Sequence, residues 1–207
     1  MKVKSKAKPK LPQMDPGVYM AVCIGVVDLG EQYSEAFKNY SNKVLFIFEF
    51  PTELIEVDGE EKPRWISREF TVSTSKKSKL LEFIGSWNGK QYTSESFGDV
   101  ELFDQIGKPC QLQLVTNESG EYTNIATVMQ LPKGVKVNRT EADTYAFDVD
   151  EWNDGFFEAL PGWIQEKIKK STQYQKDHAP TDAVDVPKEE PAVPQPETEK
   201  AEEVVPF

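Results

Sequence analysis

The fold of this chain follows from eight residues, Lys43-Val44-Leu45-Phe46-Ile47-Phe48-Glu49-Phe50. Apolar side chains, three of them phenylalanines, occupy every second position from Val44 to Phe50. A period of two predicts a β-strand, because successive side chains of a strand point to opposite faces of its sheet. We therefore expect Phe46, Phe48 and Phe50 to fill the core of a β-structure rather than to face a ligand.

Strand-like runs flank this stretch on both sides. Residues 18–29 are rich in β-branched side chains and follow Pro16-Gly17, which predicts a first strand. A polar connector that carries aromatic residues then spans 30–42. After the turn signal Asp58-Gly59, residues 64–73 return as a third strand, which predicts a hairpin with a long connection.

Helical patterns interrupt the strands. Leu80, Phe83, Ile84 and Trp87 are spaced for one face of a helix over 76–87, so we expect Trp87 in the core. A shorter helical stretch is expected over 99–106. Strands at 110–116 and 122–130 follow, joined by a turn-rich loop. A last helix begins at Pro161 and packs its apolar stripe on the barrel or on a second subunit.

This order of elements defines the expected fold class. Three strands, an inserted helix and two strands follow the order of an oligonucleotide-binding (OB) barrel, so we predict a mainly β, five-stranded OB-fold barrel with a C-terminal helix. The predicted parts are a basic arm at 1–14, the barrel domain at 15–139 and an acidic connector with the last helix at 140–171. A disordered acidic tail is predicted at 172–207.

Charge is distributed unevenly along the chain. Residues 140–207 contain 17 Asp and Glu against 6 Lys and Arg, whereas residues 1–139 contain 18 of each. The sequence pI of 4.7 therefore conceals a neutral body, which does not argue against a nucleic-acid ligand. Positive charge within the body is clustered at Lys76, Lys77 and Lys79 and in an N-terminal arm with Lys2, Lys4, Lys6, Lys8 and Lys10.

The chain ends in an acidic, proline-rich segment with an apolar tip. Such a segment buries too little apolar surface to offset the entropy of ordering it, so we expect disorder. Its last residues are Glu202, Glu203, Val204, Val205, Pro206 and Phe207. An apolar tip that carries a free carboxylate is typical of a peptide captured by a pocket on a partner protein.

A series of short motifs resembles a known family. The motifs are Phe70-Thr71-Val72-Ser73, Ser78-Lys79-Leu80, Trp87-Asn88-Gly89-Lys90, Tyr92-Thr93, Gly107-Lys108-Pro109-Cys110, the strand Tyr122 to Ile125 and the helix Leu160 to Ile164. In this order, and together with the Pro-Phe tip, they resemble a group of single-stranded-DNA-binding proteins of bacteriophages. The resemblance covers roughly residues 15–170 and the tip.

The resemblance implies a function. A protein of this group coats and protects single-stranded DNA during phage replication, recombination or repair, in the cytoplasm of the infected bacterium. It recruits replication or recombination proteins, such as a polymerase, a helicase-primase or a nuclease, through its C-terminal tip. It is not an enzyme and uses no cofactor or metal. A homodimer is compatible with the sequence.

Sequence-independent binding of single strands needs cations for the phosphates and aromatic rings for the bases. The connector after the first strand forms one rim of an OB cleft, and its aromatic residues have no periodic partners. On the third strand, Arg64 and Arg68 share one face and Trp65 takes the other, so Trp65 is either a core residue or a DNA contact. The candidates for DNA contact are Tyr33, Phe37, Lys38, Tyr40, Lys43, Arg64, Trp65, Arg68, Lys76, Lys77, Lys79 and Tyr122.

Two alternative interpretations apply to the lysines. The cluster of Lys76, Lys77 and Lys79 is either a phosphate site at the start of a helix or an ordinary solvated basic face. The lysines of the N-terminal arm either add non-specific phosphate affinity or only increase solubility.

Most catalytic chemistries lack their residues in this sequence. The only histidine, His178, lies in the predicted tail, which argues against triads, imidazole catalysis and histidine zinc sites. Cys23 and Cys110 lie in apolar runs and are expected as reduced core residues of a cytosolic protein. Residues 148–159 fail as a calcium loop, because Trp152 and Ala159 replace oxygen ligands. No run is long enough to span a membrane.

Two other functions remain open from the sequence. A phage structural or assembly protein with a β-barrel is one, and a metal-dependent nuclease that relies on carboxylates is the other.

Overall fold

The computed structural model describes residues 12–57, 59–139 and 143–178. Six strands form one sheet: β1 (Gly17–Ser34), β2 (Asn39–Val57), β3 (Glu60–Thr71), β4 (Pro109–Thr116), β5 (Thr123–Met129) and β6 (Tyr145–Phe147). Five of them pair antiparallel in the order β3-β2-β1-β4-β5, and β6 pairs parallel with β1. The predicted mainly β fold is confirmed, with six strands in place of five.

The sheet is not closed. Strands β3 and β5 end the path of pairing and share no backbone ladder within the described residues. A side chain joins them instead: Nη1 of Arg68 on β3 donates hydrogen bonds to the carbonyl oxygens of Ile125 (2.8 Å) and Ala126 (3.0 Å) on β5. The predicted five-stranded barrel is therefore not confirmed.

Strands β1 and β2 extend well beyond the hydrophobic pattern that predicted them. The expected connector over 30–42 is mostly paired strand, from Gly30↔Lys43 to Ser34↔Asn39, and only residues 35–38 form the turn. Backbone pairing does not require apolar side chains, so this polar ribbon leaves no alternating hydrophobic signal. The prediction of a loop here was wrong.

The connection between β2 and β3 is also shorter than expected. The two strands continue to Val57 and from Glu60, with a register shift between Phe50 and Leu54. Pro51 stands at this irregularity, where a residue without an N–H is tolerated. Of the two turn residues, Gly59 has φ +85°, and Asp58 lies outside the described residues.

Helix α1 (Lys79–Asn88) begins later than the predicted residue 76. The side chain of Ser78 accepts a hydrogen bond from the Leu81 N–H and fixes the start, and Gly89 ends the helix in the left-handed conformation at φ 61°. The helix expected over 99–106 is replaced by α2 (Ser94–Gly98) and a single 3₁₀ turn, η1 (Phe103–Gln105).

Three short helices, not one, follow strand β6. They are α3 (Asp154–Ala159), α4 (Gly162–Ile168) and α5 (Thr172–Asp177). Pro161 precedes α4 as its N-cap residue rather than as its first helical residue. Helix α5 is capped by Ser171, so the prediction that disorder begins at residue 172 was wrong, and the rest of the predicted tail, 179–207, lies outside the described residues.

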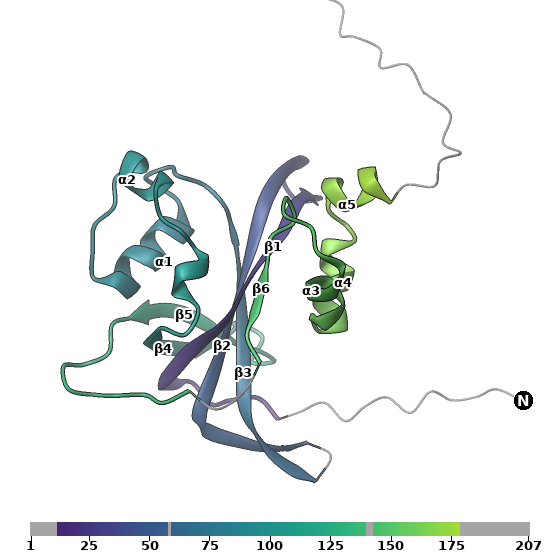
Figure 1. Cartoon of the computed structure of the whole chain (residues 1–207). Coiled ribbons are helices and arrows are strands. Elements are labelled where there is room, and N and C mark those ends of the chain that lie inside the picture. Colours follow the sequence, from purple (N-terminus) through teal and green to yellow (C-terminus); the bar gives the residue numbers. More distant parts are fainter. Residues whose placement is uncertain (1–11, 58, 140–142, 179–207) are drawn as a thin grey trace, which may run out of the picture.

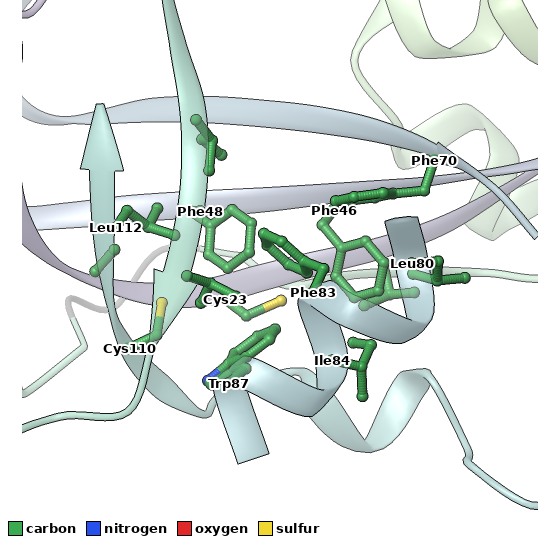
Figure 2. Packing of buried hydrophobic residues seen from close by; sticks show 14 of the residues in the cluster. Cys23, Phe46, Phe48, Phe70, Leu80, Phe83, Ile84, Trp87, Cys110 and Leu112 are labelled. Atoms are coloured by element: carbon green, nitrogen blue, oxygen red, sulfur yellow. The ribbon is translucent and has the colours of Figure 1, made fainter. Parts of the chain in front are cut away.

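One hydrophobic cluster lies between the sheet and helix α1. Phe46, Phe48 and Phe50 are fully buried, as predicted, and Phe83 and Trp87 of α1 pack against the first two of them (Figure 2). The indole N–H of Trp87 donates to the carbonyl oxygen of Pro109 at 3.1 Å, so its single polar atom is satisfied. The expectation that Trp87 belongs to the core is confirmed.

A second cluster covers the opposite face of β1 and β2. Leu45 and Ile47 alternate with the phenylalanines along β2 and pack with Ile164 and Ile168 of α4. Figure 1 shows α3, α4 and α5 on the side of the long strands opposite to α1 and α2. The C-terminal helices therefore dock on the sheet of their own chain, the first of the two alternatives that the sequence left open.

Both cysteines are buried and unpaired. Burial raises the pKa of Cys23 to about 12 and raises that of Cys110 as well. A thiol that stays protonated is a poor nucleophile and metal ligand. The two residues therefore act as small core side chains, as expected.

Asp28 generates a prediction about pH. Its Oδ1 accepts a hydrogen bond from the Gly30 N–H at 2.8 Å. Burial raises its pKa, and the carboxylates of Asp148 and Asp150 raise it further. Because the folded chain holds this proton more tightly than the unfolded chain, this group adds stability as the pH falls through the raised pKa.

We therefore expect Asp28→Asn to raise the free energy of unfolding at pH 7. The substitution removes the buried negative charge, and the amide oxygen of Asn can still accept the hydrogen bond from the Gly30 N–H. The gain should shrink as the pH is lowered through the raised pKa, because the wild-type carboxyl then becomes protonated. Urea unfolding at several pH values measures this, with the exposed Asp99→Asn as control. A gain that is independent of pH would contradict the account.

Candidate nucleic-acid interface

A hollow lined by cations lies at the C-terminal end of β3. It has a volume of about 480 Å³, and Lys43, Arg68, Lys77 and Lys79 line it together with one carboxylate, Glu69. Phe70 also lines it, as do four hydroxyl-bearing residues, namely Thr71, Ser73, Ser75 and Ser78. Cations mixed with hydroxyl donors are the groups that proteins use to hold phosphates.

Three different segments bring the lysines together. Lys43 on β2 pairs in register with Thr71 of β3, and its Nζ donates to the Thr71 Oγ1 at 2.7 Å. Lys77 lies in the turn before α1, where its backbone N–H donates to the Ser75 Oγ. Lys79 is the first residue of α1, placed by the Ser78 cap. The cluster is a product of the tertiary fold.

Neighbouring carboxylates only partly neutralise the hollow. Glu69 forms a salt bridge with Lys167 of α4, with 2.6 Å between Oε2 and Nζ. Glu82 forms one with Lys79, with 2.9 Å between the same two kinds of atom. The hydrogen bond from Lys79 lowers the pKa of Glu82. The side chains of Lys79 and Glu82 are 76% and 70% exposed, and a pair so open to solvent is weak and screened by salt. Lys79 can therefore exchange its carboxylate for a phosphate.

Arg68 plays a different part from the lysines. It is half-buried, with its guanidinium carbon 4.8 Å from the centre of the Phe70 ring and 5.6 Å from that of Phe83. Burial lowers its pKa, an effect that Glu82 opposes. Its Nη1 also donates to two carbonyl oxygens of β5, so Arg68 links β3 to β5.

An apolar groove lies near the N-terminal end of β3. Its volume is about 930 Å³, and its lining includes Arg64, Trp65 and Tyr122 from the predicted set. Trp65 is 43% exposed, and its ring lies 5.7 Å from that of Tyr145 on β6. The alternative that Trp65 is a core residue is therefore wrong. It lies on the face of β3 opposite to Arg68, as the strand period predicted.

The remaining aromatic candidates lie at the tip of the β1–β2 hairpin. The rings of Tyr33 and Tyr40 are 5.0 Å apart, and Phe37 in the turn is 79% exposed. Lys38 has a positive φ of 54° and completes the turn. Tyr40 stands three residues from Lys43, or about 10 Å along β2. These four residues of the tip are not among those that line the cationic hollow or the apolar groove.

The three lysines of the predicted cluster, Lys76, Lys77 and Lys79, do not all line the same hollow. Lys77 and Lys79 line the hollow, but Lys76 lines a separate hollow together with Lys90 and Tyr92. The lysines of the N-terminal arm and the tip residues Glu202 to Phe207 lie outside the described residues. His178, expected in the tail, instead stacks on Tyr174 with ring centres 4.1 Å apart.

Sequence reasoning missed part of both surfaces. Ser73, Ser75 and Ser78 of the hollow fall in the short polar turn between β3 and α1, and Thr71 ends β3, so no hydrophobic period marks these residues. The groove also takes Pro12, Met14 and Tyr145 from segments remote in sequence. The only available signal was the density of Ser and Thr over residues 71–78.

Comparison with protein-family models, curated proteins and solved structures finds no match. Across the described ranges, His, Cys, Asp and Glu side chains do not form any group of three that suits a metal ion. No helix in the described part of the chain is long and apolar enough to cross a membrane.

The bridge made by Arg68 generates a prediction. Arg68→Met keeps much of the side-chain volume but removes the donor to Ile125 and Ala126, so we expect a loss of about 1–3 kcal/mol in the free energy of unfolding. Arg64→Met is the matched control, since Arg64 makes one exposed bond, to the Pro12 carbonyl oxygen at 2.8 Å. Equal losses in the two variants, measured by urea unfolding, would contradict a special role for Arg68.

Proposed function

We propose that this chain is a sequence-independent single-stranded-DNA-binding protein that coats and protects the strand without acting as an enzyme. The observation that carries the proposal is the arrangement along β3. The cationic hollow, which Arg68 helps to line, lies at one end of the strand, and the groove with exposed aromatic rings lies at the other. From Arg64 to Thr71 this is a length of about 23 Å.

This arrangement suits a single strand better than a duplex. Exposed ring faces can stack only on bases that are not already stacked and paired, at about 1–3 kcal/mol per base. Lysines with neighbouring hydroxyl groups neutralise phosphates without reading the sequence. A surface that offers both, within the length of a few nucleotides, supports binding of unpaired DNA of any sequence.

The order of strands supports an OB-type barrel as the framework. The path β3-β2-β1-β4-β5, with α1 between β3 and β4, is the order of that fold. Closure of an OB barrel brings β3 against β5, and the hydrogen bonds from Arg68 to Ile125 and Ala126 span those two strands. We include this barrel in the proposal.

The role proposed for the C-terminal tip is recruitment of replication or recombination proteins. It rests on the sequence of the tip, two valines followed by Pro206 and Phe207 behind an acidic segment. A chain that ends at His178 keeps every described helix and strand, so it is the truncation that separates recruitment from DNA binding.

Titration of labelled oligo-dT and of a duplex of equal length, in Mg²⁺ and across a salt series, tests the proposed function. We expect preference for the single strand, affinity that falls with salt and an oligonucleotide that is intact afterwards. Preference for the duplex or absence of binding would overturn the proposal. A degraded oligonucleotide would indicate a nuclease instead.

A triple variant tests the place of binding. Lys43, Lys77 and Lys79 changed to Gln should reduce the slope of log affinity against log salt by about 2, since each neutralised phosphate contributes about 0.7. The matched control changes Lys169, Lys170 and Lys176 to Gln on the C-terminal helices, with the same loss of charge. An equal reduction in the control would place the DNA elsewhere.

A further inference from the structure

Glu69 is the one carboxylate in the lining of the cationic hollow. Because opposite charges attract, a carboxylate here competes with the phosphates of a strand for the same cations. In the folded chain its Oε2 is instead bound by Nζ of Lys167 on α4, at 2.6 Å. The two residues are 98 positions apart in the sequence, so this pairing exists only because α4 docks on the sheet.

The packing of α4 holds Lys167 in place. The helix lies on the side of the sheet opposite to α1 (Figure 1), and its Ile164 and Ile168 are fully buried there. The carbonyl oxygen of Lys167 also accepts a hydrogen bond from Nε2 of Gln32 on β1, at 3.1 Å. The backbone of Lys167 is therefore fixed by the fold, and only its side chain has to be ordered to reach Glu69.

Strand register also places Glu69 close to Lys43. Lys43 on β2 pairs with Thr71, which stands two positions after Glu69 on β3. The two charged residues are thus diagonal neighbours on one face of the sheet, and such neighbours lie about 7–8 Å apart, within reach of long side chains. The present partner of the Lys43 ammonium group is the Thr71 hydroxyl, at 2.7 Å. A neutral partner leaves the positive charge of Lys43 available to a phosphate.

We propose that Lys167 is a positioning residue for the binding of single-stranded DNA. Its salt bridge holds Glu69 at α4, which keeps this carboxylate from pairing with Lys43 and leaves Lys43 to a phosphate of the strand. Lys167 acts through Glu69 and does not itself contact the DNA. The inference rests on the proposed function and assigns α4 a part in the electrostatics of the hollow.

Direct contact between Lys167 and a phosphate is the alternative that the experiment separates. Lys167 is not among the residues that line the hollow. If it acts through Glu69, its loss weakens binding only while Glu69 carries its charge. A direct contact would be lost whether or not that charge is present. A double-mutant cycle on the two residues therefore distinguishes the two cases.

The experiment measures oligo-dT binding by the full-length chain and by Lys167→Gln, Glu69→Gln and the double variant, across a salt series. At about 0.1 M salt, Lys167→Gln should bind about fivefold more weakly, with a salt slope smaller by about 0.7, because one phosphate contact is lost. In the Glu69→Gln background, the same change at Lys167 should alter the affinity by less than about twofold.

Two further variants serve as controls. Lys167→Arg keeps a cation for Glu69 and should bind oligo-dT as the wild-type chain does. Lys170→Gln removes one exposed charge just after α4 and should leave both the affinity and the salt slope unchanged. A loss in Lys170→Gln equal to that in Lys167→Gln would mean that only the total charge matters, and would overturn the inference.

Two other results would also overturn it. One is an unchanged affinity in Lys167→Gln. The other is an equal loss with and without the charge of Glu69, which would follow from a direct phosphate contact or from a weakened fold. A wild-type chain that does not bind oligo-dT overturns the proposed function itself, so the two failures are distinguishable.

Discussion

Burial of both faces of β2 is the constraint on which the rest of the structure depends. Phe46 and Phe48 face one layer, and Leu45 and Ile47 face the other. One cover comes from α1, β4 and β5, and the other from β6 and the C-terminal helices (Figure 1). A strand buried on both sides cannot present a binding surface over its central residues, because removing either cover would expose large apolar side chains to water.

A ligand can reach the sheet only beyond the residues of β2 that these two layers cover. Strand β3 has its free edge toward β5, and hydrogen bonds from Arg68 connect the two strands. The hollow and the groove lie at the two ends of that strand. In the proposed complex, the single strand follows β3, with its phosphates on the lysines and its bases on Trp65 and Tyr122. We propose that the C-terminal helices α3, α4 and α5 stabilise the sheet and do not contact the DNA.

The sequence predicted what local periodicity encodes. Alternation identified β2 and its buried phenylalanines, and helical spacing placed Trp87 in the core. The polar ends of β1 and β2 were missed because their pairing leaves no hydrophobic pattern, and β6 was missed because three residues are too short to show a period. The lysines of the site were recognised by type, but their grouping depends on tertiary structure. Lys43 of β2 lines the same hollow as Lys77 and Lys79, whereas Lys76 lines a different one.

Hydrogen exchange of the full-length chain, measured with and without saturating oligo-dT, tests the central claim that the single strand follows β3. Protection should appear over residues 64–79 and 122–126, while residues 154–177 of the C-terminal helices keep the exchange rates of the free protein. Protection concentrated on those helices, with β3 unchanged, would contradict the account.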